Sequence, residues 1–72
     1  MKPQMFLVFH VDVATPTRMG SIRVAQPVEM GLYYEGEGRC VRNAERRVRE
    51  RLLAHGCMTL ATQFGNVLIK GE

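Results

Sequence analysis

Apolar and polar residues alternate along residues 5–13, near the start of the chain. A period of two residues is typical of a β-strand, whose successive side chains point to opposite faces of a sheet. One face is wholly apolar and consists of Met5, Leu7, Phe9, Val11 and Val13. The other face changes from apolar to polar along the chain and consists of Phe6, Val8, His10 and Asp12. The pattern predicts a strand with its first face on the core, ended by Pro16, which lacks a backbone N–H.

Two shorter alternating segments follow. Residues 21–26 predict a second strand with Ile22 and Val24 pointing inward and Arg23 outward, stopped by Pro27. Residues 30–34 predict a third strand, in which Tyr33 points away from the apolar face. The glycines of residues 35–38 suit a turn or the approach to a helix.

Between residues 41 and 55 the apolar period lengthens from two residues to that of an α-helix. Four apolar side chains then share one narrow sector with His55, namely Val41, Ala44, Val48 and Leu52. Asn43 is a candidate N-cap for a later start, and Gly56 suits the left-handed position that ends a helix. The pattern predicts one amphipathic helix over about residues 41–55.

The last segment predicts a hairpin of residues 57–63 and 67–70 around a Gly65-Asn66 turn. In this register one face consists of Leu60, Thr62, Phe64, Val67 and Ile69. The predicted order is strand, strand, strand, helix, strand, strand. The fold class is therefore α+β, a small, mostly antiparallel sheet of about five strands with one amphipathic helix packed on one face. A chain of 72 residues forms a single domain, residues 1–72.

The composition says more about the cellular compartment of the protein than about its function. Hydrophobic residues make up 46% of the chain, as in ordinary globular domains, and no apolar run is long enough for a membrane span or a secretory signal. Cys40 and Cys57 are too few for a disulfide framework, so we expect two free thiols and a cytoplasmic protein.

Positive charge gathers on the predicted helix. Residues 39–55 hold six of the ten basic residues and only two acidic ones, whereas the rest of the chain has a slight acidic excess. Arg42, Arg46 and Arg49 form a ridge at helical spacing, flanked by Arg39, Arg47 and Arg51. Guanidinium groups match carboxylates and phosphates bidentately. Two interpretations stay open, a solvated helix face or a contact surface for an acidic protein or a nucleoprotein complex.

A nucleic acid is the second class of partner for this helix. The predicted fold has no second helix for a helix-turn-helix pair, and amide side chains are scarce on the helix. Such a contact would therefore be to phosphates, with strong salt dependence and little sequence preference.

The sheet face that the helix leaves open is a second candidate surface. We expect Arg23, Tyr33 and His10 to lie there, with Phe6 and Val8 nearby. An exposed patch with apolar residues suits a partner, or a second copy of the chain in a homodimer.

Residue types suited to catalysis or metal binding are present without a matching pattern. His10 and Asp12 share a strand face, which suits a general base and its orienting carboxylate, but no nucleophile motif or phosphate loop accompanies them. His55 and Cys57 have the chemistry of zinc ligands, at a spacing that fits no familiar site. We therefore predict no catalytic residue, no metal and no cofactor.

Two resemblances extend these predictions. Residues 5–13 resemble the first strand of muconolactone isomerase, a ferredoxin-like enzyme, which implies a small dimeric enzyme or ligand-binding protein as one hypothesis. In size and layout the chain is similar to small phage-encoded anti-CRISPR inhibitors, which implies a protein that obstructs a nuclease complex. The leading hypothesis is a non-enzymatic interaction module, a phage or mobile-element inhibitor, that acts through its basic helix.

Overall fold

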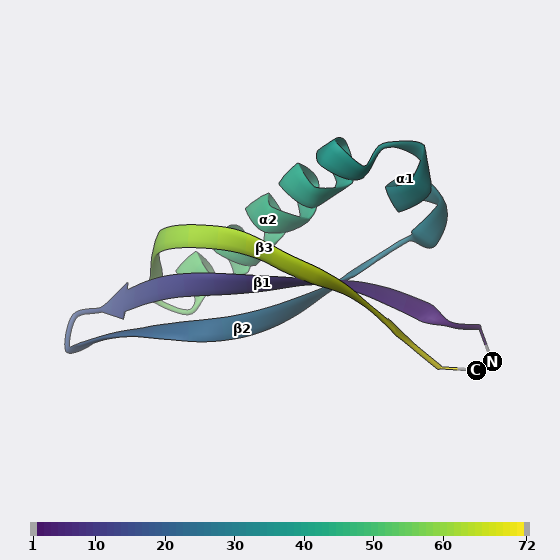
Figure 1. Ribbon diagram of the computed structural model, residues 1–72. Coiled ribbons are helices and arrows are strands. Elements are labelled where there is room, and N and C mark those ends of the chain that lie inside the picture. The colour runs from purple at the N-terminus through teal and green to yellow at the C-terminus, as the bar shows by residue number, and fades with distance from the viewer. Residues whose placement is uncertain (1, 72) are drawn as a thin grey trace.

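A three-stranded antiparallel sheet carries two helices on one of its faces (Figure 1). The computed structural model describes residues 2–71. Its elements are β1 (Gln4–Thr15), β2 (Arg18–Val28), α1 (Met30–Glu35), α2 (Glu37–Ala54) and β3 (Met58–Lys70). The strand order is β2-β1-β3, so the first strand lies in the centre. The predicted α+β class with one main helix on an antiparallel sheet is confirmed, whereas five strands was wrong because three are found.

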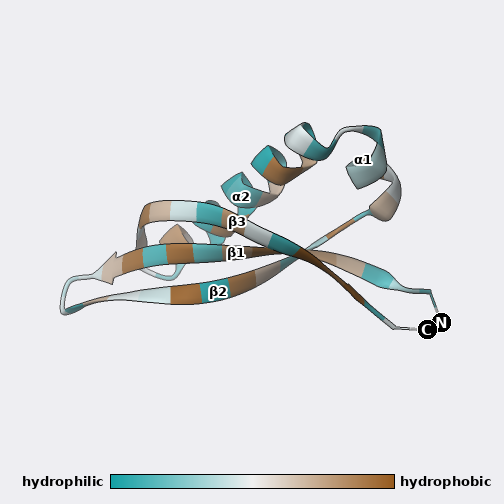
Figure 2. Cartoon of the chain, in the orientation of Figure 1, coloured by the Kyte–Doolittle hydropathy of each residue, from teal (hydrophilic) through white to brown (hydrophobic). Residues whose placement is uncertain are grey.

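β1 is the predicted first strand, and its alternation sets the two faces of the sheet. Met5, Leu7, Phe9 and Val11 are almost completely buried. Leu7, Phe9 and Val11 pack with Ala44 and Val48 of α2 in the core. Each fully buried side chain of this size contributes about 1.5 to 3 kcal/mol of transfer free energy. In Figure 2 brown hydrophobic residues alternate with paler or teal ones along the strands.

β2 is longer than the predicted second strand. It pairs with β1 from Thr15 opposite Arg18 to Met5 opposite Val28, across a tight turn at residues 16–17. Pro27, expected to stop the strand, lies inside it opposite Phe6. A proline is tolerated there because β2 is an edge strand and one side of its backbone has no neighbour to bond.

Residues 30–34, predicted as a third strand, instead form the helix α1. The Tyr33 N–H donates to the Glu29 carbonyl at 3.1 Å, and the Gly36 N–H donates to the Leu32 carbonyl at 3.2 Å. An apolar run this short fits either period, so its pattern could not separate a strand from a helix. The helical path satisfies the backbone groups locally while the chain turns from the end of β2 over the sheet.

α2 begins at Glu37, which is earlier in the chain than predicted. Gly36 lies between α1 and α2 and flanks both helices. Asn43 therefore lies inside the helix, and its predicted capping position was wrong. The C-terminal end is as expected, with Gly56 at φ 80° just beyond the last turn. The predicted apolar stripe is confirmed, since Ala44 and Val48 are buried and Val41 and Leu52 pack against the core.

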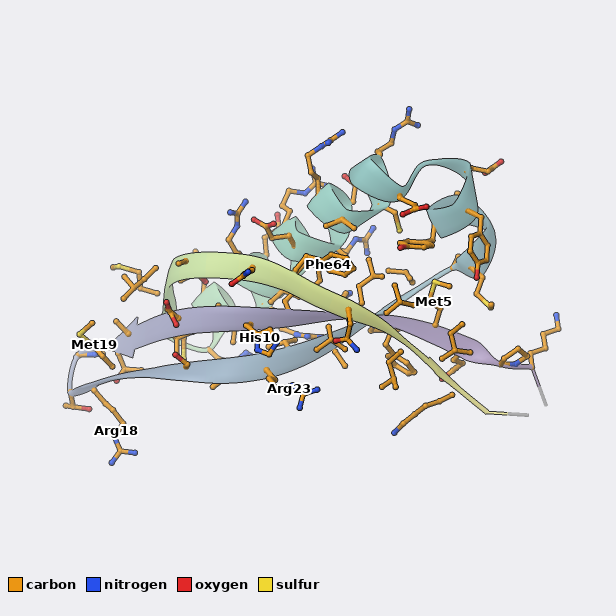
Figure 3. All side chains as sticks on the ribbon, viewed as in Figure 1. Met5, His10, Arg18, Met19, Arg23 and Phe64 are labelled. Carbon is orange, nitrogen blue, oxygen red and sulfur yellow. The ribbon has the colours of Figure 1, made fainter. Side chains whose placement is uncertain are left out.

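The predicted C-terminal hairpin is one continuous strand, β3, with two irregularities in its pairing to β1. At the first, Val8 lies opposite Asn66 and Phe9 opposite Phe64, so Gly65 is an extra residue. A bulge and a two-residue turn both place Phe64 and Val67 on the same face, which is why the hydrophobic pattern suggested a turn. Phe64 reaches the core beside Phe9, with ring centroids 5.7 Å apart (Figure 3).

Candidate functional site

The arginines of α2 do not form one uniform surface. All six are exposed, and α2 presents its apolar stripe to the sheet, so nitrogen-tipped side chains project from its far side (Figure 3). Arg42 and Arg46 lie about one helical turn apart on the exposed side of α2, and we call this pair the outer arginines. The predicted exposure of the arginine ridge agrees with the structure, but its members differ in their surroundings.

Arg49 is partly neutralised within its own helix. Its Nη1 lies 3.0 Å from Glu45 Oε2, in the i,i+4 arrangement predicted by the spacing. Such an exposed pair contributes only about 0.3 to 0.5 kcal/mol. Within residues 2–71 it is the single salt bridge, so the other five α2 arginines have no carboxylate partner there.

Arg39 and Arg47 line a groove between α2, α1 and the end of β2, and we call them the groove arginines. The groove has a volume of about 340 Å³. Asn43 lies between the two arginines in sequence and lines the same wall. The apolar part of the lining includes Pro27, Val28, Leu32, Cys40 and Ala44. The groove therefore combines positively charged side chains with apolar ones.

Gln26 lines this groove at an inward position of β2, opposite the buried Leu7. Only 9% of the residue is exposed, and its side-chain Oε1 has no hydrogen-bond partner among the described residues. A buried amide oxygen without a donor is destabilising, so native proteins rarely keep one without a reason. Gln26 is the polar group at the base of the groove.

Two carboxylates also line the groove. Glu29 and Glu35 line it, at the two ends of α1. Nearby, the Tyr33 hydroxyl donates to Glu37 Oε1 at 3.2 Å. Partial burial and the Glu37 carboxylate raise the pKa of Tyr33 above its ordinary value. The groove is thus positive along α2 and negative along α1.

A second hollow of about 410 Å³ adjoins the first around the end of β2. The two share Pro27, Val28 and Glu29, and the second is completed by residues at the start of β1, including Pro3 and Met5. It has no arginine in its lining. The charged groove is therefore the hollow whose chemistry matches the predicted basic surface.

The open face of the sheet differs from the prediction at Tyr33 and at Val8, which was expected in an exposed patch but is buried, with 3% of its surface exposed. Arg23 and His10 are exposed neighbours there, as expected (Figure 3). Tyr33 is not on this face, because it belongs to α1 and packs against the core on the helix side. The end of the sheet near the β1–β2 turn is more apolar than expected. Met19 and Met58 lie on either side of Ala14, and 74% and 62% of their surfaces are exposed. Association of two copies through this face stays a prediction.

The residues considered for general-base chemistry lie on the same open face. Asp12 Oδ1 accepts a hydrogen bond from Ser21 Oγ at 2.6 Å, and His10 lies opposite Arg23 and Gln63. Neither of the two hollows is lined by His10 or Asp12. Both hollows described among residues 2–71 therefore lie away from this pair.

The candidate metal ligands are not brought together. Cys40 and Cys57 are both free thiols, and in the part of the chain that the structure describes no three His, Cys, Asp or Glu side chains gather in a way that could hold a metal ion. The His55 Nδ1 lies 2.9 Å from the Arg51 carbonyl, so its N–H caps the last turn of α2. That bond agrees with the predicted helix-end position of His55.

Sequence reasoning missed three groove residues, Gln26, Asn43 and Glu35. Gln26 had a readable signal, because it continues the inward register of Ile22 and Val24 with a polar side chain. Asn43 and Glu35 join the groove only because α1 folds beside α2, which no local pattern indicated.

The rest of the molecule adds two negative findings. Neither α1 nor α2, the helices found in residues 2–71, combines the length and apolar character that crossing a bilayer requires. Comparisons with protein-family models, curated protein sequences and solved structures gave no significant match to this chain.

Proposed function

We propose that this protein is a non-enzymatic interaction module that binds an acidic protein surface through the arginines of α2 and blocks that surface from other partners. The observation that carries the proposal is the concentration of six exposed arginines on one helix, of which only Arg49 has an ion-pair partner within residues 2–71. Unpaired guanidinium groups on a rigid element keep their bidentate donors available for carboxylates.

An acidic protein suits this surface better than a nucleic acid does. Glu45 and Glu50 stand between the arginines of α2, and Glu29, Glu35 and Glu37 lie in or beside α1 and at the start of α2. A continuous phosphate backbone would be repelled by them, whereas a protein can offer carboxylates only opposite the arginines. The mixed pattern therefore favours a partner with discrete negative charges.

Occlusion is the mode of action that the proposal shares with the small phage-encoded inhibitors that the chain resembles in size and layout. A scaffold of 72 residues with its helix packed on the sheet presents the arginines with little loss of conformational freedom on binding. It needs no catalytic group in order to inhibit, because it covers the surface that another molecule uses.

Charge reversal tests the proposal with a defined acidic probe, fluorescently labelled poly-L-glutamate. One triple variant reverses Arg42, Arg46 and Arg49 to Glu. The matched control reverses three exposed basic residues outside α2, Lys2, Arg18 and Lys70, to Glu. Both variants change the formal charge equally, so any difference reports location. We expect the helix variant to lower the affinity by more than about ten-fold relative to the control.

The same titration with a random-sequence DNA duplex separates the two classes of partner. We expect poly-L-glutamate to bind at low salt and the duplex to bind more weakly. Equal loss of poly-L-glutamate binding in both triple variants would show that the arginines of α2 are not the binding surface. Tighter binding of the duplex than of poly-L-glutamate would identify a nucleic acid, and not an acidic protein, as the class of partner.

A further inference from the structure

We propose that the groove between α1, α2 and the end of β2 seats one extended segment of the acidic partner, with carboxylates for Arg39 and Arg47 and a polar backbone group for Gln26. This inference rests on the proposed function and adds the place where the partner inserts and the residue pattern that the place accepts. It separates the groove arginines, which select a segment, from the outer arginines, which attract acidic surfaces in general.

The spacing of the groove arginines sets the pattern. Arg39 and Arg47 are eight residues apart on α2, a rise of about 12 Å along the helix axis. In an extended peptide, side chains four residues apart point the same way and are separated by about 13 Å. A segment with acidic residues at its first and fifth positions therefore meets both arginines, and its third residue lies beside Asn43.

The base of the groove supplies the second observation. Gln26 is nine-tenths buried and its Oε1 has no partner among the described residues, although the residue lines the hollow. An extended segment carries unpaired backbone N–H and C=O groups, and the Gln26 oxygen can accept from such an N–H while its NH2 group can donate to such a carbonyl. Val28, Leu32 and Ala44 beside it offer apolar surface for the second and fourth side chains of the segment.

The two carboxylates restrict what else can enter. Glu29 and Glu35, at the two ends of α1, line the same groove as the groove arginines. A segment that carried carboxylates on both of its sides would meet repulsion at α1, and so would a phosphate chain. The groove therefore selects a segment that is acidic on one side and aliphatic on the other, such as Glu-Val-Thr-Leu-Glu.

NMR titration of the full chain tests this directly, because the side-chain amides of Gln26 and Asn43 report on the groove itself. The probe is the blocked peptide acetyl-Glu-Val-Thr-Leu-Glu-amide, and its control is the scrambled peptide Glu-Glu-Val-Leu-Thr with the same charge. We expect the ordered peptide to shift both amide signals and to bind about ten-fold more tightly than the scrambled one. The substitutions Arg39→Ala and Arg47→Ala should abolish that preference, whereas Arg42→Ala and Arg46→Ala should preserve it.

Each outcome separates the inference from the proposed function. If both peptides bind alike and shift only signals near the outer arginines while poly-L-glutamate still binds, the inference is wrong and the proposed function stands. If poly-L-glutamate does not bind either, both are wrong. If a DNA duplex shifts the Gln26 and Asn43 amides more than the ordered peptide does, the occupant is a phosphate chain and the inference is overturned.

A near-isosteric variant distinguishes a ligand-binding role of Gln26 from a structural one. We expect Gln26→Met to keep or raise the thermal midpoint, because it removes an unpartnered buried oxygen, and to lose the preference for the ordered peptide. A lower midpoint with an unchanged preference would show that Gln26 serves the fold and would overturn its place in the proposal.

Discussion

The two sides of this small sheet differ in how their polar groups are satisfied. On the open side Asp12 bonds to Ser21 across the strands, and Arg23 stands beside His10 at the surface of a shallow face. On the helix side five of the six α2 arginines have no ion-pair partner within residues 2–71, and two of them border a hollow with a buried, unpartnered amide. Arg23 has no ion-pair partner among the described residues either, so the two sides differ in the number of unpaired arginines and in the hollow beside them. The comparison therefore points to the helix side as the surface that recognises a partner.

The free edges of the sheet carry features that discourage association through strand pairing. Pro27 interrupts the row of backbone donors along β2, and the two pairing irregularities distort β3. Prolines and bulges are the devices by which edge strands avoid adding further strands. Recognition through side chains of α2 is consistent with edges that discourage backbone pairing.

The largest expected effect concerns where the core lies. Phe9 is fully buried on the helix side, whereas Phe6 is half-buried on the open side. We expect Phe9→Ala to lower the free energy of unfolding by about 3 to 5 kcal/mol, and Phe6→Ala by about 1 to 2 kcal/mol. Urea denaturation followed by circular dichroism measures both, and equal losses would contradict a one-sided core.

The next effect sharpens the contrast between the two charged surfaces. We expect Arg46→Glu to weaken binding of poly-L-glutamate by about five-fold or more, since one exposed pair is worth up to about 1 kcal/mol and reversal adds repulsion. Arg23→Glu makes the same charge change on the open face and should leave the affinity nearly unchanged. Fluorescence anisotropy at constant salt compares them. The reverse ranking would move the binding surface to the open face.

A smaller effect concerns close packing on the open side. A Cβ added at Gly65 would lie 2.9 Å from two atoms of the His10 ring. We expect Gly65→Ala to cost about 1 kcal/mol through this overlap, and to cost much less in a His10→Ala background. Thermal unfolding of the four proteins in this cycle measures the coupling, and additive effects would mean that the ring moves aside freely.

The smallest expected effect is a dependence of the folding stability on alkaline pH, through Tyr33 near the groove. The pKa of Tyr33 is raised in the folded chain, so its neutral form contributes stability below the ordinary tyrosine pKa of about 10. That contribution is lost as the pH rises through the raised value. We expect the stability of Tyr33→Phe to fall less than that of the natural chain over this range. Parallel curves in urea titrations at several alkaline pH values would contradict a raised pKa of Tyr33 in the folded chain.

Sequence patterns predicted the parts of this fold that bury a long, regular stripe. β1 and α2 each place several apolar residues at one period, so both elements and their inner faces could be read in advance. The predictions failed where one hydrophobic pattern fits two different local structures. Residues 30–34 fit either period, and the bulge at Gly65 preserves the same facing as a turn would.

The candidate site was predictable only in part for the same reason. The arginine spacing followed from the helix, which is long enough to be recognised. The groove depends on α1 lying beside α2 and on the end of β2, a meeting of segments that local periodicity does not encode. Tyr33 was assigned to the wrong face because its segment was assigned to the wrong element.

The most direct test of the central claim is a map of backbone amide shifts when unlabelled poly-L-glutamate is added to the isotopically labelled protein. The account predicts shifts concentrated along α2 around the outer arginines, with β1 and the open-face residues around Arg23 unaffected. Shifts concentrated around Arg23 and His10, or spread evenly over the chain, would contradict it.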